Sequence, residues 1–485
     1  MMEANREEPA AGAVRRSPAA PVRRRRANPG ASRRTLKRSQ RQRLIDAMIE
    51  LSAKRGYSAV TVTELCSYAG VSPVTFYEHF QGKEDCFLAT YLACGERIFG
   101  QMRMRAEGAA DWGGAARLAL GTLLAELQAD PDAGRLLFIE ALGAGPAVTQ
   151  ARGRVLNDFE RRTRQLFERT PSGVEGVDVP LLAVIGALRH VISRHLRTQA
   201  EDHLPTLLED GLSWIESYSV PPGTPPWSTS AATLLEDGSE PAPPAPWLPE
   251  TLPPGTHGLS AGVIARSQRM RLIYATAEVM MAKGYQEGKI SDIVAAARVA
   301  KPVFYAHFPD GKEEAFLEAQ NHPTQYILDR CADAYFSADG WPERMWRMLA
   351  TLIELIVSNR AISHLRLVEC YAAGPAAVRR AEEITRSFTI FLHEGYRYRA
   401  EAASLPRMCS QAIAGAIFGM IQRLASAGEW EQLPRHLPQL TYIAIAPFTG
   451  ALEAIAIVEG LKAHRSQGAR GRNEGRKRPP TEIVA

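Results

Sequence analysis

Cysteine and aromatic residues are scarce in this chain, and long apolar runs are absent. Its 485 residues include six cysteines, none of them at CxxC spacing. This argues against a zinc ribbon or a dense disulfide framework and is typical of a reducing cytoplasm. No apolar stretch follows the charged amino terminus, so no signal peptide is expected. The most apolar segment, near residues 442–458, contains Pro447 and Glu453 and predicts a buried helix rather than a membrane span.

The sequence also lacks the common signatures of catalytic sites. It contains no Walker loop, no GxSxG, no HExxH and no dinucleotide-binding glycine pattern. Each of these patterns positions a group that the corresponding reaction requires, so the matching enzyme classes are disfavoured. Three neighbouring histidines, His190, His195 and His203, are spaced too irregularly to predict a metal site. We therefore expect a non-enzymatic protein with no metal and no cofactor.

Positive charge is concentrated at the two ends of the chain. The net charge is +5, but residues 1–43 carry 13 Lys and Arg against three Glu, and residues 462–485 carry seven against two acidic residues. The central body is consequently acidic. Basic arms of this kind, with clusters such as Arg23–Arg26, favour a polyanionic partner such as nucleic acid. The alternative is that the arms only increase solubility.

Two halves of the chain repeat each other. Residue numbers of matching positions differ by 228 in the first part of each half, and by 229 after one insertion. A single register over about 140 residues indicates duplication of a whole domain. The matching pairs include LIDA with LIYA (44–47 and 272–275), FYEHF with FYAHF (76–80 and 304–308), Glu140 with Glu369, AGP with AGP (144–146 and 373–375), and Gly186 with Gly415.

The segment between the halves, residues 220–260, holds 11 prolines in 41 positions and predicts a linker. Inside each half strand signals are nearly absent, and segments such as 180–199 and 405–426 place apolar residues at helical spacing. We predict an all-α fold with two tandem units. A basic, disordered arm is expected at 1–37 and a basic tail at 466–485.

Residues 61–80, TVTELCSYAGVSPVTFYEHF, predict two short helices joined by a tight turn. Thr61 and Glu64 have the spacing of a capping box, so the first helix should start near Thr63. Gly70 can adopt the left-handed conformation that ends this helix. Such a pair is a helix-turn-helix, whose second helix enters the major groove of DNA.

The second helix of this motif is expected to start at Ser72 and Pro73 and to run to Phe80. At 100° per residue, Phe76 and Phe80 share the face that packs inward. The remaining side chains form an outward face and its flanks, small and polar enough to meet base edges and phosphates: Val74, Thr75, Tyr77, Glu78 and His79.

An amphipathic helix at 38–55 followed by Gly56 and Tyr57 precedes this motif, and F-x-G-K-E-x-x-F-L follows it. Across residues 41–92 the complete arrangement resembles the N-terminal domain of the tetracycline-repressor (TetR) family. The resemblance implies a head that binds double-stranded DNA with a connector helix (38–105), and a larger helical domain that binds a small hydrophobic inducer and dimerises (106–219). Carried onto this chain, it implies DNA contacts from Thr63, Thr75, Tyr77, His79 and Lys83, with Thr61, Ser72, Pro73 and Val74 as further candidates.

The second copy, with a head at 261–333 and a helical domain at 334–465, departs from this pattern. Arg298 replaces the turn glycine, and Ala300 replaces the capping serine. Its outward face becomes apolar, so it is expected to hold phosphates more readily than it reads bases. The weaker DNA-binding candidates of this head are Ser291, Lys301, Tyr305, His307 and Lys312.

Dimerisation is expected through the last two long helices of each copy, because family members generally pair in this way. These would be 180–199 with 204–218 in the first copy, and 405–426 with 437–464 in the second. Small residues would allow the helices to approach closely, namely Gly186, Gly415 and Gly419.

Two functions are compatible with these patterns. The first is a cytoplasmic, sequence-specific transcription regulator, a ligand-responsive repressor whose two halves pair as an intrachain pseudo-dimer; a homodimer of whole chains is the other arrangement. The second is a TetR-fold sensor or protein-interaction module with little specific DNA binding, which the degenerate second motif favours for half of the chain. The effector and the operator are not encoded in any recognisable motif.

Overall fold

The computed structural model describes residues 33–109, 111–168, 176–221, 223–225, 227 and 258–476. The predicted arm (except for its last five residues), most of the predicted linker and the last nine residues of the predicted tail lie outside these ranges. Within them, no helix combines the length and the apolar character needed to cross a membrane. All six cysteines are buried free thiols.

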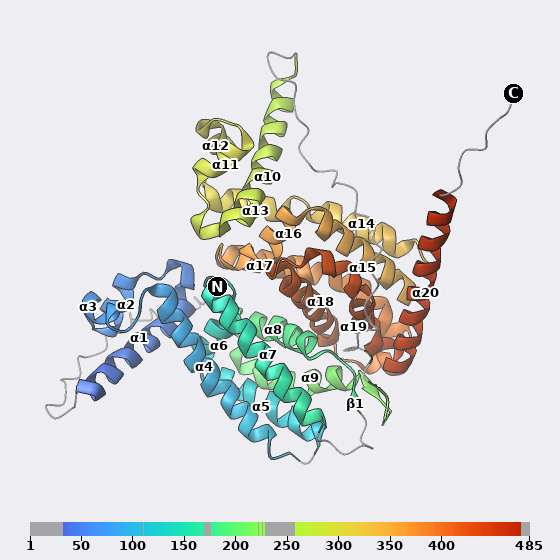
Figure 1. The fold of residues 1–485 in the computed structure, drawn as a ribbon, viewed down its shortest axis with the longest axis horizontal. Helices are drawn as coiled ribbons and strands as arrows, with labels where there is room; N and C mark the ends of the chain where they lie inside the picture. The colour runs from blue at the N-terminus through green and yellow to red at the C-terminus, as the bar shows by residue number, and fades with distance from the viewer. Residues whose placement is uncertain are drawn as a thin grey trace, which may run out of the picture.

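The first half is helical apart from one pair of short strands, and Figure 1 shows its elements from blue to green. Its elements are α1 (Arg33–Arg55), η1 (Tyr57–Ala59), α2 (Val62–Ala69), α3 (Pro73–Tyr77), α4 (Lys83–Ala106), α5 (Trp112–Ala129), α6 (Pro131–Phe138), η2 (Glu140–Leu142), α7 (Pro146–Glu168), β1 (Gly176–Val177), α8 (Leu181–Arg197), η3 (Glu201–Thr206), α9 (Leu207–Glu216) and β2 (Ser219–Val220). The strands pair antiparallel, with Gly176 opposite Val220.

The second half follows a similar order, except that two helices stand where the first half has α4, and it ends in an additional long helix. Its elements are α10 (Ala261–Glu287), α11 (Ile290–Ala297), α12 (Lys301–His307), α13 (Lys312–Asn321), α14 (Thr324–Phe336), α15 (Trp341–Ser358), α16 (Arg360–Leu367), η5 (Glu369–Tyr371), α17 (Pro375–Ser387), η6 (Phe388–Arg397), η7 (Glu401–Ser404), α18 (Met408–Ser426), η8 (Trp430–His436), α19 (Leu437–Thr449) and α20 (Ala451–Arg476). The all-α fold predicted from the sequence is confirmed.

Some helix boundaries differ from the prediction. Helix α1 begins at Arg33 rather than Arg38, and α20 continues to Arg476 through part of the predicted tail. Both extensions are polar, so they have no apolar period by which the sequence could have revealed them. The single helix predicted over 437–464 is wrong, because Gly450 at φ 94° separates α19 from α20.

Matching glycines shape the two heads in the same way. Gly56 ends α1 at φ 80°, and its counterpart Gly284 at φ 76° introduces a non-helical kink into α10. Positive φ angles of this size are readily adopted only by glycine. The duplication seen in the sequence therefore extends to backbone conformation.

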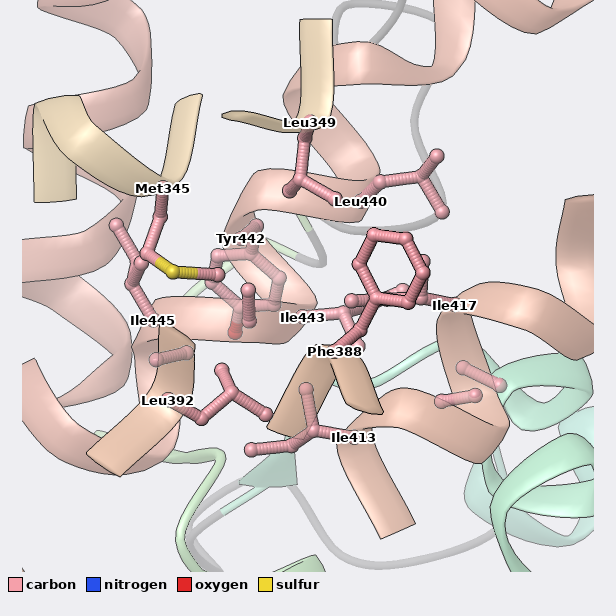
Figure 2. Close-up of a cluster of buried hydrophobic side chains, with 14 of the residues drawn as sticks. Met345, Leu349, Phe388, Leu392, Ile413, Ile417, Leu440, Tyr442, Ile443 and Ile445 are labelled. Carbon is pink, nitrogen blue, oxygen red and sulfur yellow. The ribbon is translucent and has the colours of Figure 1, made fainter. Parts of the chain in front are cut away.

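Three apolar cores hold the molecule together. The first head and most of the first helical domain share one core, and the second head shares a smaller one with α16, η5 and α17. The largest core combines the second helical domain with α8, α9 and β2 of the first half. Figure 2 shows its centre, where Phe388, Ile417 and Ile443 meet from different helices.

The halves of the chain pack against each other mainly through α8 and α18, which lie side by side at the centre of Figure 1. Glycines make this crossing close: a Cβ atom on Gly186 would lie 3.1 Å from the carbonyl oxygen of Gly415. A Cβ on Gly419 would lie 3.1 Å from the Cα of Gly186. The close helix approach expected at these three glycines is present.

Polar contacts extend the same interface to α19. The Tyr218 hydroxyl donates to the carbonyl of Ile443 at 2.8 Å, and the Tyr442 hydroxyl donates to the carbonyl of Asp178 at 2.7 Å. The indole of Trp227 donates to Glu459 at 2.9 Å. Trp227, within the predicted linker, is thus held against the second half.

Candidate nucleic-acid interface

The first helix-turn-helix is formed by α2 and α3, and local hydrogen bonds define its ends. The Thr61 hydroxyl accepts from the backbone N–H of Glu64 at 3.3 Å, and the Glu64 carboxylate accepts from the N–H of Thr61 at 3.1 Å. This is the predicted capping box. Gly70 ends α2 in the left-handed conformation, at φ 63°.

Helix α3 begins as expected and ends earlier than expected. The Ser72 hydroxyl accepts from the N–H of Thr75 at 3.1 Å, with Pro73 in the first turn. The helix ends at Tyr77 rather than Phe80, although the N–H of Phe80 still bonds the carbonyl of Phe76 at 2.9 Å. The recognition helix is therefore short, and the Ser72 cap fixes where it begins.

Burial divides the side chains of α3 into an inner and an outer face. Phe76 and Phe80 are buried in the core of the head, whereas Val74 is 71% exposed and Tyr77 is 61% exposed. Thr75 is partly exposed, and its hydroxyl lies 3.0 Å from that of Ser72. The outer face therefore offers one apolar surface, two hydroxyls and a phenol to a groove.

The flank of α3 next to α1 carries charge. Lys37 on α1 lies 3.6 Å from the carboxylate of Glu78, and the Arg41 guanidinium lies 5.3 Å from the Phe80 ring centre. His79 is partly buried, and its Nε2 atom has no hydrogen-bond partner among the described residues. Burial lowers its pKa, and the charge of Lys37 lowers it further. A neutral His79 can donate one hydrogen bond to a phosphate.

Lys83 lies at the start of α4 with its ammonium turned toward the protein. It donates to the carbonyls of Tyr57 at 3.2 Å and Ser58 at 3.4 Å, and it lies 4.4 Å from the centre of the Tyr57 ring. Burial lowers its pKa. These two bonds use two of the three N–H groups of the ammonium, so one remains for a phosphate, and the other residues predicted to contact DNA lie on or beside α2 and α3.

Three cations near the motif were not predicted as site residues: Lys37, Arg41 and Arg43. Arg43 donates to the carbonyl of Gly70 at 3.4 Å, which braces the turn of the motif. The repeat contains a signal that could have found two of them, because Arg269 and Arg271 occupy the matching positions of α10. Lys37 and Arg41, four residues apart, lie on one face of α1 beside α3, whereas Arg43 reaches the turn between α2 and α3.

The second head keeps the geometry of the first with different chemistry. Arg298 adopts the left-handed conformation at φ 52° in place of the turn glycine. Arg271 donates to its carbonyl at 2.8 Å and also to the carbonyl of Ala297. The Ala300 cap has no side-chain hydrogen bond. An arginine from the preceding helix thus braces a turn that the sequence disfavours.

The predicted contacts of the second head lie on α11, α12 and the start of α13. Ser291, Lys301 and Tyr305 are exposed, and the Lys301 ammonium lies 6.0 Å from the Tyr305 ring centre. His307 is partly buried. Lys312 donates to the carbonyls of Tyr285 at 2.7 Å and Gly288 at 3.0 Å, as Lys83 does in the first head.

Each head is fastened to its helical domain by one carboxylate. Glu140 accepts from the backbone N–H of Tyr57 at 2.7 Å, and Glu369 accepts from that of Tyr285 at 2.6 Å. Burial raises the pKa of Glu140 to about 6. The two glutamates are a matching pair of the repeat, so both heads are linked to their domains by the same contact.

Comparison with known proteins places both heads in one family. A model of the family described as bacterial regulatory proteins, tetR family, matches residues 44–90 and 272–319. In the described part of the chain, no group of three or more acidic, His or Cys side chains is arranged to hold a metal ion.

Several solved structures are similar to part of the chain. The fatty acid degradation regulator FadR of Bacillus halodurans is 18% identical, with 36% of this chain and 94% of that chain covered and a TM-score of 0.32. FadR of Bacillus subtilis, solved with stearoyl-CoA, is 19% identical over 36% and 96%, with a TM-score of 0.31. A TetR family regulator of Marinobacter aquaeolei is 19% identical over 37% and 96%, with a TM-score of 0.30.

The two heads, their caps and the two family matches agree in position along the chain. The protein carries two tandem TetR-like units, and this resemblance identifies it as a helix-turn-helix, DNA-binding regulator of transcription.

Proposed function

We propose that this protein is a ligand-responsive repressor that binds its operator as an intrachain pseudo-dimer, with sequence read mainly by the first head. The observation that carries the proposal is that one chain holds two helix-turn-helix heads whose outer faces carry different side chains. The first presents Thr75 and Tyr77 on its outer face, and the second presents Val303 and Tyr305 at the matching positions.

The packing of α8 against α18 supports the pseudo-dimer, because these are the helices expected to form the dimer interface. Two recognition helices must lie about 34–36 Å apart to enter successive major grooves. A fused duplicate supplies both from one chain, and the tether raises the local concentration of the partner half. An operator bound in this way should lack good two-fold symmetry.

A response to a small molecule would act through the connector helices α4 and α13. An effector that shifts these helices changes the distance between the two heads. It lowers operator affinity only to the extent that it binds the shifted arrangement more tightly than the DNA-binding one. The carboxylate of Glu140 or Glu369 would transmit the shift, because each bonds the backbone of its head directly.

The experiment selects an operator from random duplex DNA with the full-length protein and then titrates variants by gel shift. Thr75→Ala and Tyr77→Phe should each weaken specific binding by about 1–3 kcal/mol. The matched variants Val303→Ala and Tyr305→Phe, at the corresponding positions of the second head, should change the preferred sequence little. Equal losses of specificity from both heads would contradict the assignment of sequence reading to the first.

Light scattering at micromolar concentration tests the pseudo-dimer separately. A mass near the 53.2 kDa of one chain supports it. A stable species near twice that mass on a palindromic operator indicates a homodimer of whole chains. Absence of any sequence preference would instead favour the alternative of a sensor or interaction module, for which the altered cap and apolar outer face of the second head are the supporting observations.

A further inference from the structure

A cavity of about 70 Å³ lies where the two halves meet. Most of its wall comes from the second half, on α14 to α18 and η6, and α8 of the first half contributes Arg189 and His190. Neither half forms this cavity alone. Its polar end is lined by Arg189, Arg366, Tyr371 and Gln422.

Arg366 on α16 brings an incompletely paired charge to this cavity. Its Nη2 atom donates to the Thr324 hydroxyl at 3.3 Å, whereas its Nη1 atom is buried without a hydrogen-bond partner among the described residues. Burial lowers the pKa of the guanidinium to about 10, so it remains charged at neutral pH. A buried cation without a counter-charge is costly, and such groups in proteins are normally paired.

Arg189 brings a second cation, whose hydrogen-bond partners in the described part of the chain are neutral. It donates to the Tyr371 hydroxyl at 3.5 Å and to the amide oxygen of Gln422 at 3.4 Å, both long for hydrogen bonds. Burial lowers the pKa of nearby Arg152 to about 10, and the charge of Arg189 lowers it further. Arg189 therefore has a cation rather than an anion as its charged neighbour in Arg152.

The carboxylates of this region already have partners. Glu382, which also lines the cavity, forms an ion pair with Arg197. Glu369 accepts from the backbone N–H of Tyr285. Within the described ranges Arg189 and Arg366 thus lack an anion, and a carboxylate or phosphate between them would supply charge-assisted hydrogen bonds to both.

The cavity also has apolar walls, and a second, smaller cavity of about 20 Å³ lies next to it. Leu352, Phe388 and Phe418 line both cavities, and Met345 and Met348 line the smaller one. Figure 2 shows Met345 and Phe388 in this region, together with Leu392 and Ile417. Methionine side chains change rotamer easily, so the smaller cavity can adapt to an apolar chain that reaches it from the larger one.

The repeat does not reproduce these polar residues at the matching positions of the other half. At the matching positions of the other half, Leu137 stands for Arg366, Phe418 for Arg189 and Leu142 for Tyr371. The two copies therefore differ, with polar groups on one side of a pseudo-symmetric interface and apolar groups on the other. Packing by itself does not require polar side chains at these positions, because the other half accommodates apolar residues at the matching ones.

We infer that this cavity binds an amphipathic organic anion, with its carboxylate or phosphate head between Arg189 and Arg366 and its apolar body toward Met345 and Met348. The inference names the effector class for the ligand response in the proposed function and rests on it. Tyr371, at the polar end, belongs to the same 3₁₀ turn as Glu369, which bonds the second head. Occupancy of the polar end consequently acts on the attachment of that head.

Calorimetric titration of the full-length protein tests this site with four probes: sodium octanoate, octyl phosphate, 1-octanol and sodium acetate. We expect one equivalent of octanoate or octyl phosphate to bind, with the better of the two identifying the head group. Octanol lacks the charge and acetate lacks the apolar body, so both should bind at least about tenfold more weakly. Arg366→Leu, which copies the residue of the first half, should weaken octanoate at least about tenfold, since hydrogen bonds to charged groups are worth at least that much.

Two further variants keep the test decisive. Arg189→Gln should also weaken octanoate binding, and it provides a second measurement if Arg366→Leu unfolds the chain. Arg360→Gln is the matched control, because Arg360 lies on the same helix but pairs at the surface with Glu431. Unchanged octanoate binding in both site variants, octanol binding as tight as octanoate, or no binding of either octyl anion at millimolar concentration would overturn the inference.

Operator binding is measured on the same protein without any probe. Octanoate binding without operator binding would leave the site intact and remove the proposed function. If the protein binds an operator but no octyl anion binds the protein or changes its operator affinity, the proposed function stands and the inferred effector site is wrong.

Discussion

Substitution of Glu140 is the most direct test of how the first head is fastened to its helical domain. The carboxylate is partly buried between the two and accepts a hydrogen bond from the backbone N–H of Tyr57 at 2.7 Å. Burial raises its pKa from 4.5 to about 6, although the Tyr57 N–H and the charge of Arg197 both act to lower it. Glu140→Gln keeps an acceptor for the N–H without the charge, and Glu140→Ala removes both.

The raised pKa determines the sign of the pH dependence. Because the pKa is about 6 in the folded chain and 4.5 for an ordinary glutamate, the folded chain binds more protons between these values. The contribution of Glu140 to the free energy of unfolding is present below pH 4.5 and is lost as the pH rises through 6. The difference between the two pKa values corresponds to about 2 kcal/mol.

We therefore expect the free energy of unfolding of Glu140→Gln, minus that of the wild type, to increase by about 2 kcal/mol between pH 4 and pH 7.5. Glu140→Ala leaves the buried N–H of Tyr57 without a partner, so it should be less stable than Glu140→Gln by about 1–3 kcal/mol throughout. Urea unfolding followed by circular dichroism at intervals of half a pH unit measures both differences. Parallel pH profiles for Glu140→Gln and the wild type would refute the argument.

Two other predictions concern the turn of the motif and the contact between the halves. Arg298→Gly removes the backbone strain of a non-glycine residue at φ 52°, so it should stabilise the chain by about 1 kcal/mol. Gly70→Ala at the matching turn introduces such strain and should destabilise the chain by a similar amount. Thermal unfolding of both variants measures the two effects, and effects of the same sign would contradict the prediction. Gly415→Ala places a Cβ 2.5 Å from the Cβ of His190, so it should cost about 1–3 kcal/mol through overpacking. Gly460→Ala, where a Cβ meets nothing within 4 Å, is its control in urea unfolding, and equal stability of the two variants would show that the α8–α18 contact is loose in solution.

The sequence alone determined those features that depend on neighbours along the chain. Thr61 with Glu64, Gly70, and Ser72 with Pro73 specify caps and a turn within a few residues of each other, so these residues by themselves locate the motif. The repeat register located the second head and exposed its altered turn. Even where a helix ended differently, as α3 does at Tyr77, the face carrying Phe76 and Phe80 was identified correctly from the helical period.

Tertiary structure alone decided the features that depend on contacts distant in sequence. Lys83 was expected to face DNA, but its ammonium is held by carbonyls 25 and 26 residues earlier in the chain. No local pattern distinguishes Arg366, buried with a nitrogen that no described residue pairs, from Arg360 at the surface of the same helix. Arg366 is buried where its guanidinium donates to Thr324 on α14, and a contact between segments distant in sequence leaves no periodic signal in the sequence.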